Sequence, residues 1–68
     1  MTTKAEHFAS TVRWSTKLES ALTLMSGALT EARQSGVPVK QIEEMIRIHK
    51  SIERMWDSSL GRILELKR

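Results

Sequence analysis

The sequence predicts an all-α fold, an antiparallel two-helix hairpin that dimerises into a four-helix bundle. Apolar residues recur at helical spacing in two stretches of roughly 30 residues, and one turn segment at 35–38 separates them. The chain has 68 residues and no cysteine. A chain this short rarely stabilises itself on one core, so a second copy is the expected source of further packing. We expect a single domain at 1–68, with helices at about 4–34 and 38–67.

The first helix has recognisable signals at both ends. Thr3 followed by Glu6 is the pattern of a capping box, in which each residue satisfies a backbone N–H of the other. At the other end, Gly36 can take the left-handed conformation that ends a helix, which lets Val37 pack back on the last turn. One polar residue, Ser15, interrupts the apolar stripe between these signals. The stripe consists of Phe8, Val12, Leu18, Leu22, Met25, Leu29 and Ala32.

The second helix is predicted to begin with Pro38, because a missing N–H costs nothing in the first turn of a helix. Its apolar stripe is interrupted by His49 and Ser59. Placing the helices antiparallel about the turn puts Ser15 opposite Ser59 and apolar residues opposite one another along most of the remaining length. The stripe consists of Ile42, Met45, Ile46, Ile52, Trp56, Ile63 and Leu66.

Apolar residues remain beside the two stripes after the contact between the helices has been assigned. A two-helix hairpin cannot cover them, and in water they would expose a large apolar area for a small protein. Small residues around Gly27 form a smooth strip that another helix can approach closely. The small Ser15–Ser59 pair leaves space for a ring, either that of Trp14 or that of a second copy's Trp56. We expect the dimer interface to contain Trp14, Ala21, Leu24, Ala28, Met55, Trp56 and Leu60.

The residue pattern contains no arrangement typical of an enzyme or a metal site. The serines, His7, His49 and Asp57 are spread along rods and do not converge in a cleft, so we expect no catalytic, cofactor-binding or metal-binding residues. His49 is interpreted as a partly buried, hydrogen-bonded histidine, with a pH-sensitive switch as the alternative. The apolar runs are too short to span a bilayer, and the first residues lack the apolar core of a secretory signal, which favours a cytoplasmic location.

The outward face of the second helix is the main candidate for a binding surface. Arginines lie beside apolar residues there, as they do at many protein interfaces. The formal net charge of +3 comes from 11 Lys and Arg against 8 Asp and Glu, and the acids alternate with the bases. This mixture favours a protein partner over nucleic acid, although Arg47, Lys50 and Arg54 of two chains contacting phosphates would make an RNA- or DNA-binding dimer. The predicted partner-binding residues are Val37, Val39, Glu44, Arg47, Ile48, Lys50 and Arg54.

The capped first helix, the Gly36-Val37-Pro38 turn and the second helix from Val39 to Leu66 resemble the small two-helix regulators encoded by bacteriophages and plasmids. The resemblance covers the whole chain and is architectural. One such group is the phage quorum-sensing anti-activators, which sequester a LuxR-type transcription factor of the bacterial host. A weaker resemblance is to the Rop-like RNA-binding hairpin dimers, which need a basic and aromatic face, whereas the aromatic residues here lie at predicted packing contacts. The first resemblance implies a homodimer that inhibits a transcriptional activator by stoichiometric binding.

Overall fold

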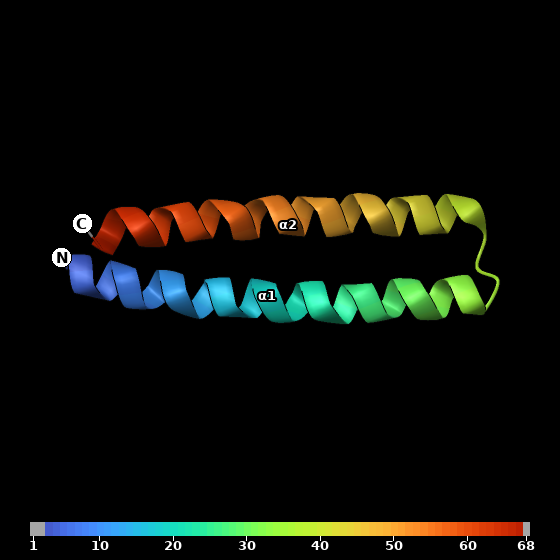
Figure 1. Cartoon of the computed structure of the whole chain (residues 1–68), viewed down its shortest axis with the longest axis horizontal. Coiled ribbons are helices and arrows are strands. Elements are labelled where there is room, and N and C mark those ends of the chain that lie inside the picture. Colours follow the sequence, from blue (N-terminus) through green and yellow to red (C-terminus); the bar gives the residue numbers. More distant parts are fainter. Residues whose placement is uncertain (1–2, 68) are drawn as a thin grey trace.

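Residues 3–67, the part of the chain that the computed structural model describes, form two antiparallel helices joined by a tight turn (Figure 1). Helix α1 spans Lys4–Gln34 and helix α2 spans Val39–Lys67. The start of α1 and the end of α2 lie at one end of the rod, and the turn lies at the other. The rod measures 49 × 19 × 14 Å, and its length is that of α1 itself, because 31 helical residues extend for about 46 Å. The predicted helical hairpin is confirmed.

Helix α1 begins with Thr3 as its N-cap, as the sequence predicts. The Thr3 backbone is extended, with φ −79° and ψ 164°, and its side-chain oxygen accepts a hydrogen bond from the Glu6 backbone N–H at 3.1 Å. This bond satisfies one of the donors that a helix N-terminus leaves without an intrahelical partner. The Glu6 carboxylate in the same turn also opposes the positive end of the helix dipole. Both effects stabilise the first turn of α1.

Helix α1 ends in a Schellman motif centred on Gly36. The φ of Gly36 is 74°, a left-handed conformation that strains any residue with a Cβ. The Gly36 N–H donates to the Arg33 carbonyl at 3.4 Å, and the Val37 N–H donates to the Ala32 carbonyl at 3.1 Å. Val37 is half-buried, in agreement with the predicted packing onto the last turn of α1. These bonds reverse the chain within a few residues and hold the helices side by side.

Helix α2 begins at Val39, one residue after the Pro38 at which the sequence predicts its start. The Pro38 carbonyl accepts hydrogen bonds from the N–H groups of Gln41 at 3.0 Å and Ile42 at 3.2 Å. Proline suits this place because its fixed φ is compatible with entry into a helix and its missing N–H removes no intrahelical bond.

The two helices meet along positions that repeat every seven residues. The buried and half-buried residues at the contact are spaced alternately three and four apart in both helices. Such a repeat is typical of helices that pack at a shallow angle with interleaved side chains, as in coiled coils. In α1 the contact residues are Phe8, Thr11, Ser15, Leu18, Leu22, Met25, Leu29 and Ala32. In α2 they are Ile42, Met45, His49, Ile52, Trp56, Ser59, Ile63 and Leu66.

Thr11 occupies the contact position that the sequence analysis assigns to Val12. Thr11 is 3% exposed, whereas Val12 is 37% exposed and lies one position outside the seven-residue frame. The Thr11 hydroxyl donates to the His7 carbonyl at 2.7 Å. Because its polar group is satisfied inside its own helix, Thr11 can be buried at the contact at little cost.

The predicted pairing of Ser15 with Ser59 is confirmed. Ser59 is fully buried and Ser15 nearly so, and their hydroxyl oxygens lie 2.7 Å apart. The Ser59 hydroxyl is also within hydrogen-bond distance of the Trp56 carbonyl, one turn earlier in α2. A hydroxyl carries one proton, so the Ser59 hydroxyl can donate to only one of these two oxygens at a time. When it donates to the Trp56 carbonyl, it accepts a hydrogen bond from the Ser15 hydroxyl. When it donates to Ser15, the Trp56 carbonyl keeps only its bond within the helix. This polar pair is satisfied without water.

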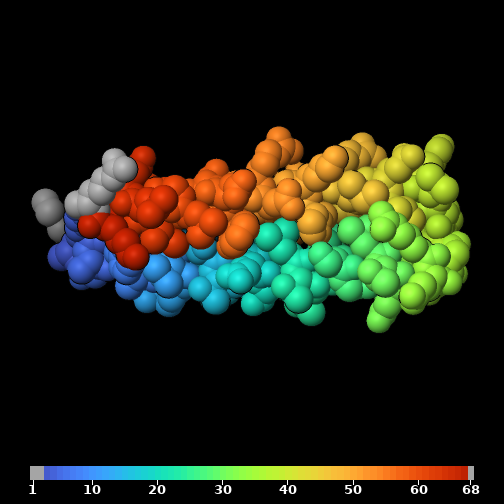
Figure 2. Space-filling model, viewed as in Figure 1, coloured from blue at the N-terminus to red at the C-terminus, as the bar shows by residue number. Residues whose placement is uncertain are grey.

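The contact between the helices buries no apolar side chain completely. Among residues 3–67, only Thr11, Ser15 and Ser59 are buried, and the apolar contact residues are half-buried. Each helix has only one neighbour to pack against, and the space-filling view shows both helices exposed along the whole face in sight (Figure 2). The radius of gyration is 15.6 Å, against about 11 Å for a compact domain of this length. The isolated hairpin therefore lacks the closed apolar core that normally stabilises a folded domain.

Candidate protein-binding surfaces

The surface of the hairpin carries shallow depressions, and none of the three described below is an enclosed cavity. Within residues 3–67, no group of three or more His, Cys, Asp or Glu side chains is placed to hold a metal ion. Neither described helix has a stretch apolar enough to cross a membrane. The candidate binding surfaces are the two flanks of the hairpin, its edges and its ends.

One flank of the hairpin, the Trp14 face, is apolar along most of its length. In a seven-residue frame the positions just beside the contact on this side are 7, 14, 21 and 28 in α1 and 41, 48, 55 and 62 in α2, and antiparallel packing brings both sets together. The open end of this flank therefore carries His7 and Arg62. Trp14 and Met55 indeed line one depression of 390 Å³, with Leu18, Arg54 and Ser58. The Trp14 face consists of Trp14, Ala21, Leu24, Ala28, Ile48 and Met55.

A second depression continues the Trp14 face toward the turn. It measures 360 Å³, and Ile48, Ile52 and Met55 line it with a rim formed by Glu44, Arg47 and Ser51. Met55 belongs to both depressions. Ile48, assigned from the sequence to partner binding, and Met55, assigned to the dimer interface, therefore lie on one continuous surface.

The opposite flank, the Leu60 face, carries charged residues at its middle. Its exposed apolar residues are Val12, Leu60 and Leu64 near the open end of the hairpin and Val39 near the turn, and half-buried Ile46 lies on the same side. In the seven-residue frame, Glu19 and Glu53 lie beside the contact at the middle of this flank. Leu60, predicted for the dimer interface, thus lies on the side away from Trp14.

Trp56 lies between the helices and not on either flank. It is half-buried, and its indole Nε1 is buried without a hydrogen-bond partner. A buried donor without a partner costs about 1–3 kcal/mol. Because this nitrogen is enclosed within the hairpin, it offers no hydrogen bond to a second protein at the surface.

The outer edge of α2, opposite the helix contact, carries a row of basic residues. Lys40, Arg47 and Arg54 are spaced seven residues apart and are exposed, and we call this row the arginine edge. Glu43 and Glu44 lie beside it, as do other charged residues of both signs. Lys50, also exposed, points between this edge and the Leu60 face. Of the predicted partner-binding residues, Glu44, Arg47, Lys50 and Arg54 are thus on or next to the arginine edge.

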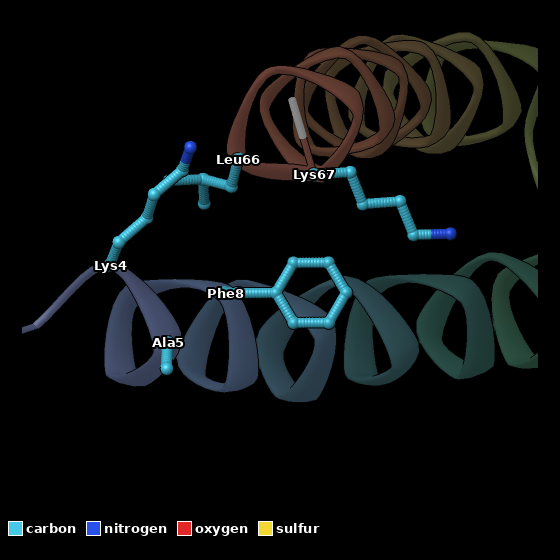
Figure 3. A pocket seen from close by; sticks show the side chains of 5 residues that line it. All are labelled: Lys4, Ala5, Phe8, Leu66 and Lys67. Atoms are coloured by element: carbon cyan, nitrogen blue, oxygen red, sulfur yellow. The ribbon is translucent and has the colours of Figure 1, made fainter.

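The two ends of the rod differ in character. At the turn, Val39 is 72% exposed while Val37 is half-buried, so Val39 is the valine available for a partner. At the open end, Phe8 of α1 and Leu66 of α2 form a shallow depression with Ala5 and the aliphatic parts of two lysines (Figure 3). This depression is shallow and open to solvent.

His49 lies at the helix contact and bonds to a side chain of the other helix. Its Nε2 is 3.3 Å from Ser26 Oγ, and the residue is half-buried. The predicted hydrogen-bonded histidine is therefore confirmed in position. A Cβ built at Gly27 meets no atom of the chain within 4 Å, so the close approach of a second copy's helix at this glycine stays a prediction. The close approach that would explain this glycine does not occur inside the hairpin.

The structural role of Thr11 and the contribution of Ser58 to the Trp14 depression are not predicted from the pattern of apolar residues. The signal that finds both is the seven-residue frame. Thr11 falls at a contact position, and Ser58 falls on the same flank as Met55. A search for apolar residues alone omits small hydroxyl residues at such positions.

Comparison of the chain with protein-family models, with curated proteins and with solved structures finds no match in any of the three. Function is therefore argued from the surfaces themselves.

Proposed function

We propose that this protein is a non-enzymatic regulator, a homodimeric helical hairpin that inhibits a bacterial protein by stoichiometric binding. The observation that carries the proposal is the combination of large exposed apolar side chains with arginines around shallow depressions. On residues 3–67, eight large apolar side chains are between 37% and 75% exposed. Protein interfaces combine apolar anchors with a charged rim, whereas small-molecule sites enclose most of their ligand. The surface suits a protein partner better than a substrate.

The charge distribution favours protein over nucleic acid as the target. The arginine edge provides three cations per chain, but Glu43 and Glu44 lie beside it and would repel phosphates. A protein partner can place a basic group against each carboxylate and an acidic group against each arginine. Mixed charges of this kind give a protein interface specificity.

The target that we favour is a transcriptional activator of the LuxR type in the cytoplasm of a bacterial host. The support for this choice is the architectural resemblance to phage anti-activators. In this proposal Arg47 and Arg54 pair with carboxylates of the activator, and Val39 at the turn adds an apolar contact. Covering the activator's DNA-binding surface would stop transcription without any chemical step.

The experiment is affinity capture from a bacterial lysate with the tagged protein, with and without nuclease. We expect a stoichiometric protein that is retained after nuclease treatment by the wild type and by Arg13→Glu, and lost from the double variant Arg47→Glu, Arg54→Glu. Arg13 is a suitable control because it is an exposed arginine on the outer edge of the other helix. The captured protein should then fail to shift its promoter DNA when the hairpin is added. Capture of RNA or DNA that disappears with nuclease would instead support the Rop-like alternative.

A further inference from the structure

We infer that the two depressions that share Met55, together called the Met55 groove, bind one amphipathic helix of a protein target, whose acidic residues at two positions seven apart pair with Arg47 and Arg54. The inference rests on the protein target in the proposed function and adds the kind of segment that this target presents. Its support is the length and lining of the groove, the spacing of the two arginines and the positions of the acidic residues in the chain.

The Met55 groove follows α2 on the Trp14 side of the hairpin. Its lining runs from Glu44 to Ser58 for about 21 Å, the length of about 14 residues of a partner helix. The two depressions measure 360 and 390 Å³, and neither is enclosed. A small molecule needs a site that surrounds most of its surface, whereas a helix can lie in an open groove of this length.

Apolar side chains form the floor of the groove at the spacing that a packed helix requires. Ile48, Ile52 and Met55 are four and three positions apart on α2, the same spacing with which α2 packs against α1. Ile48 is 49% exposed and Met55 is 51% exposed. A third helix that continues the seven-residue repeat would cover these side chains as the helices of a bundle cover one another.

Small residues of α1 leave the floor of the groove uncovered. In the register set by the buried serine pair, Ala21 lies level with Met55 and Ala28 lies level with Ile48. Neither alanine is long enough to reach across the flank and cover its neighbour on α2. Trp14 is the large side chain of α1 that borders the groove, at the end toward the termini. A partner helix therefore finds space along most of the groove and an aromatic contact at one end.

Two arginines form the outer rim of the groove. Arg47 and Arg54 are exposed, each lines one of the depressions, and they lie about 10.5 Å apart along α2. Within residues 3–67, neither guanidinium forms an ion pair. A helix packed along α2 presents the same side every seven residues, so two acidic residues at that spacing meet both arginines in either direction of the helix. Such charge-assisted pairs fix the register of the partner helix.

A second copy of this chain does not meet the same requirement. Among its eight acidic residues, no two are seven positions apart, so one helix of a second copy cannot pair with both arginines. The small-residue strip around Gly27 lies on the outer side of α1 and stays open for the second copy of the proposed homodimer. In this arrangement Trp14 and Met55 contact the target, and the outer side of α1 contacts the second copy.

Nucleic acid suits the groove less well than an acidic helix does. The floor is apolar, and Glu44 lies on the rim beside Arg47. Phosphates that followed the arginines would leave the floor uncovered and come close to this carboxylate. An amphipathic helix covers the floor with its apolar side and carries acidic residues only opposite the arginines.

Binding of two designed peptides tests the inference. The first has about 21 residues, with leucine at the contact positions of three seven-residue repeats and glutamate at two flanking positions seven apart. The second has lysine at those two positions. In fluorescence anisotropy with the full-length protein, the lysine peptide should bind about tenfold more weakly or worse than the glutamate peptide. The double variant Arg47→Glu, Arg54→Glu should reverse this preference. Absence of binding, or equal binding of both peptides, would overturn the inference.

Substitutions in the floor show whether the peptide occupies the groove. Ile48→Ser and Met55→Ser should each weaken binding of the glutamate peptide about tenfold. Leu64→Ser on the Leu60 face is the control, because it removes an apolar side chain that is 62% exposed, and it should leave binding unchanged. All three variants should keep the wild-type mass in sedimentation equilibrium. A fall to the mass of one chain for the two floor variants alone would place a second copy in the groove and overturn the inference.

Failure of this inference is distinguishable from failure of the proposed function. A wild-type protein that captures a bacterial protein from the lysate but binds neither peptide keeps its regulatory function and loses the helix-binding groove. A protein that prefers the glutamate peptide but captures no bacterial protein supports the groove and contradicts the proposed function.

Discussion

Because Ser15 and Ser59 are hydrogen-bonded, removing one hydroxyl should destabilise the protein, whereas removing both should leave its stability unchanged or raise it. Ser59→Ala removes a fully buried hydroxyl and leaves that of Ser15, 5% exposed, without its partner across the helices. An unsatisfied buried hydroxyl lowers stability by about 1–3 kcal/mol, and the higher helix propensity of alanine offsets about 0.5 kcal/mol of this loss. We therefore expect Ser59→Ala to lower the free energy of unfolding by about 1–2 kcal/mol per chain.

The double variant Ser15→Ala, Ser59→Ala should be close to the wild type or more stable. It removes both hydroxyls, so no unsatisfied group remains, and each alanine improves helix propensity. The measurement is urea unfolding followed by far-UV circular dichroism at one protein concentration, because association contributes to stability. A single variant as stable as the wild type, or a double variant that loses the sum of the two single effects, would refute this reasoning.

Three further predictions concern the helix ends and glycines. Gly61→Ala should raise the free energy of unfolding by about 1 kcal/mol, because a Cβ there meets open space and alanine favours the helix. Gly27→Ala should have the same effect for the same reason. A lower thermal midpoint for Gly27→Ala would show that packing requires this glycine. Gly36→Ala should lower stability by about 1–2 kcal/mol because φ is 74°, which a thermal midpoint unchanged from the wild type would contradict. Thr3→Ala should cost about 1 kcal/mol through loss of the N-cap bond, with faster amide exchange in the first turn of α1 as its signature.

Most of the fold follows from local signals in the sequence. Thr3, Gly36 and Pro38 mark helix boundaries through backbone chemistry, which depends on few neighbours. The opposition of Ser15 and Ser59 follows from the length of the turn, because antiparallel helices have one register once the turn is fixed. The prediction that Val12 lies at the contact is wrong, because it gives apolar character more weight than spacing. The seven-residue frame places Thr11 at the contact, and its internal hydrogen bond removes the usual objection to burying it.

The candidate surfaces are harder to predict from the sequence than the fold is. Residues beside a helix contact fall on two different flanks, and a list of leftover apolar residues does not separate them. Met55 and Leu60 were grouped together for this reason, although Met55 shares a depression with Trp14 and Leu60 lies on the other flank. The helical spacing of the outward residues of the second helix groups Ile48 with Arg47, with packing of Ile48 into the dimer as the alternative. Adjacent residues on a helix point about 100° apart, so Ile48 belongs to the Trp14 face while Arg47 belongs to the outer edge.

The most direct test of the central claim is the thermal midpoint of the wild-type protein as a function of its concentration. If a second copy completes the core, folding and association are coupled, and a hundredfold increase in concentration should raise the midpoint by roughly 10 °C. A cooperative, fully helical transition whose midpoint does not change with concentration would show that the hairpin is stable alone. That result would contradict the claim that the exposed apolar face is completed by self-association.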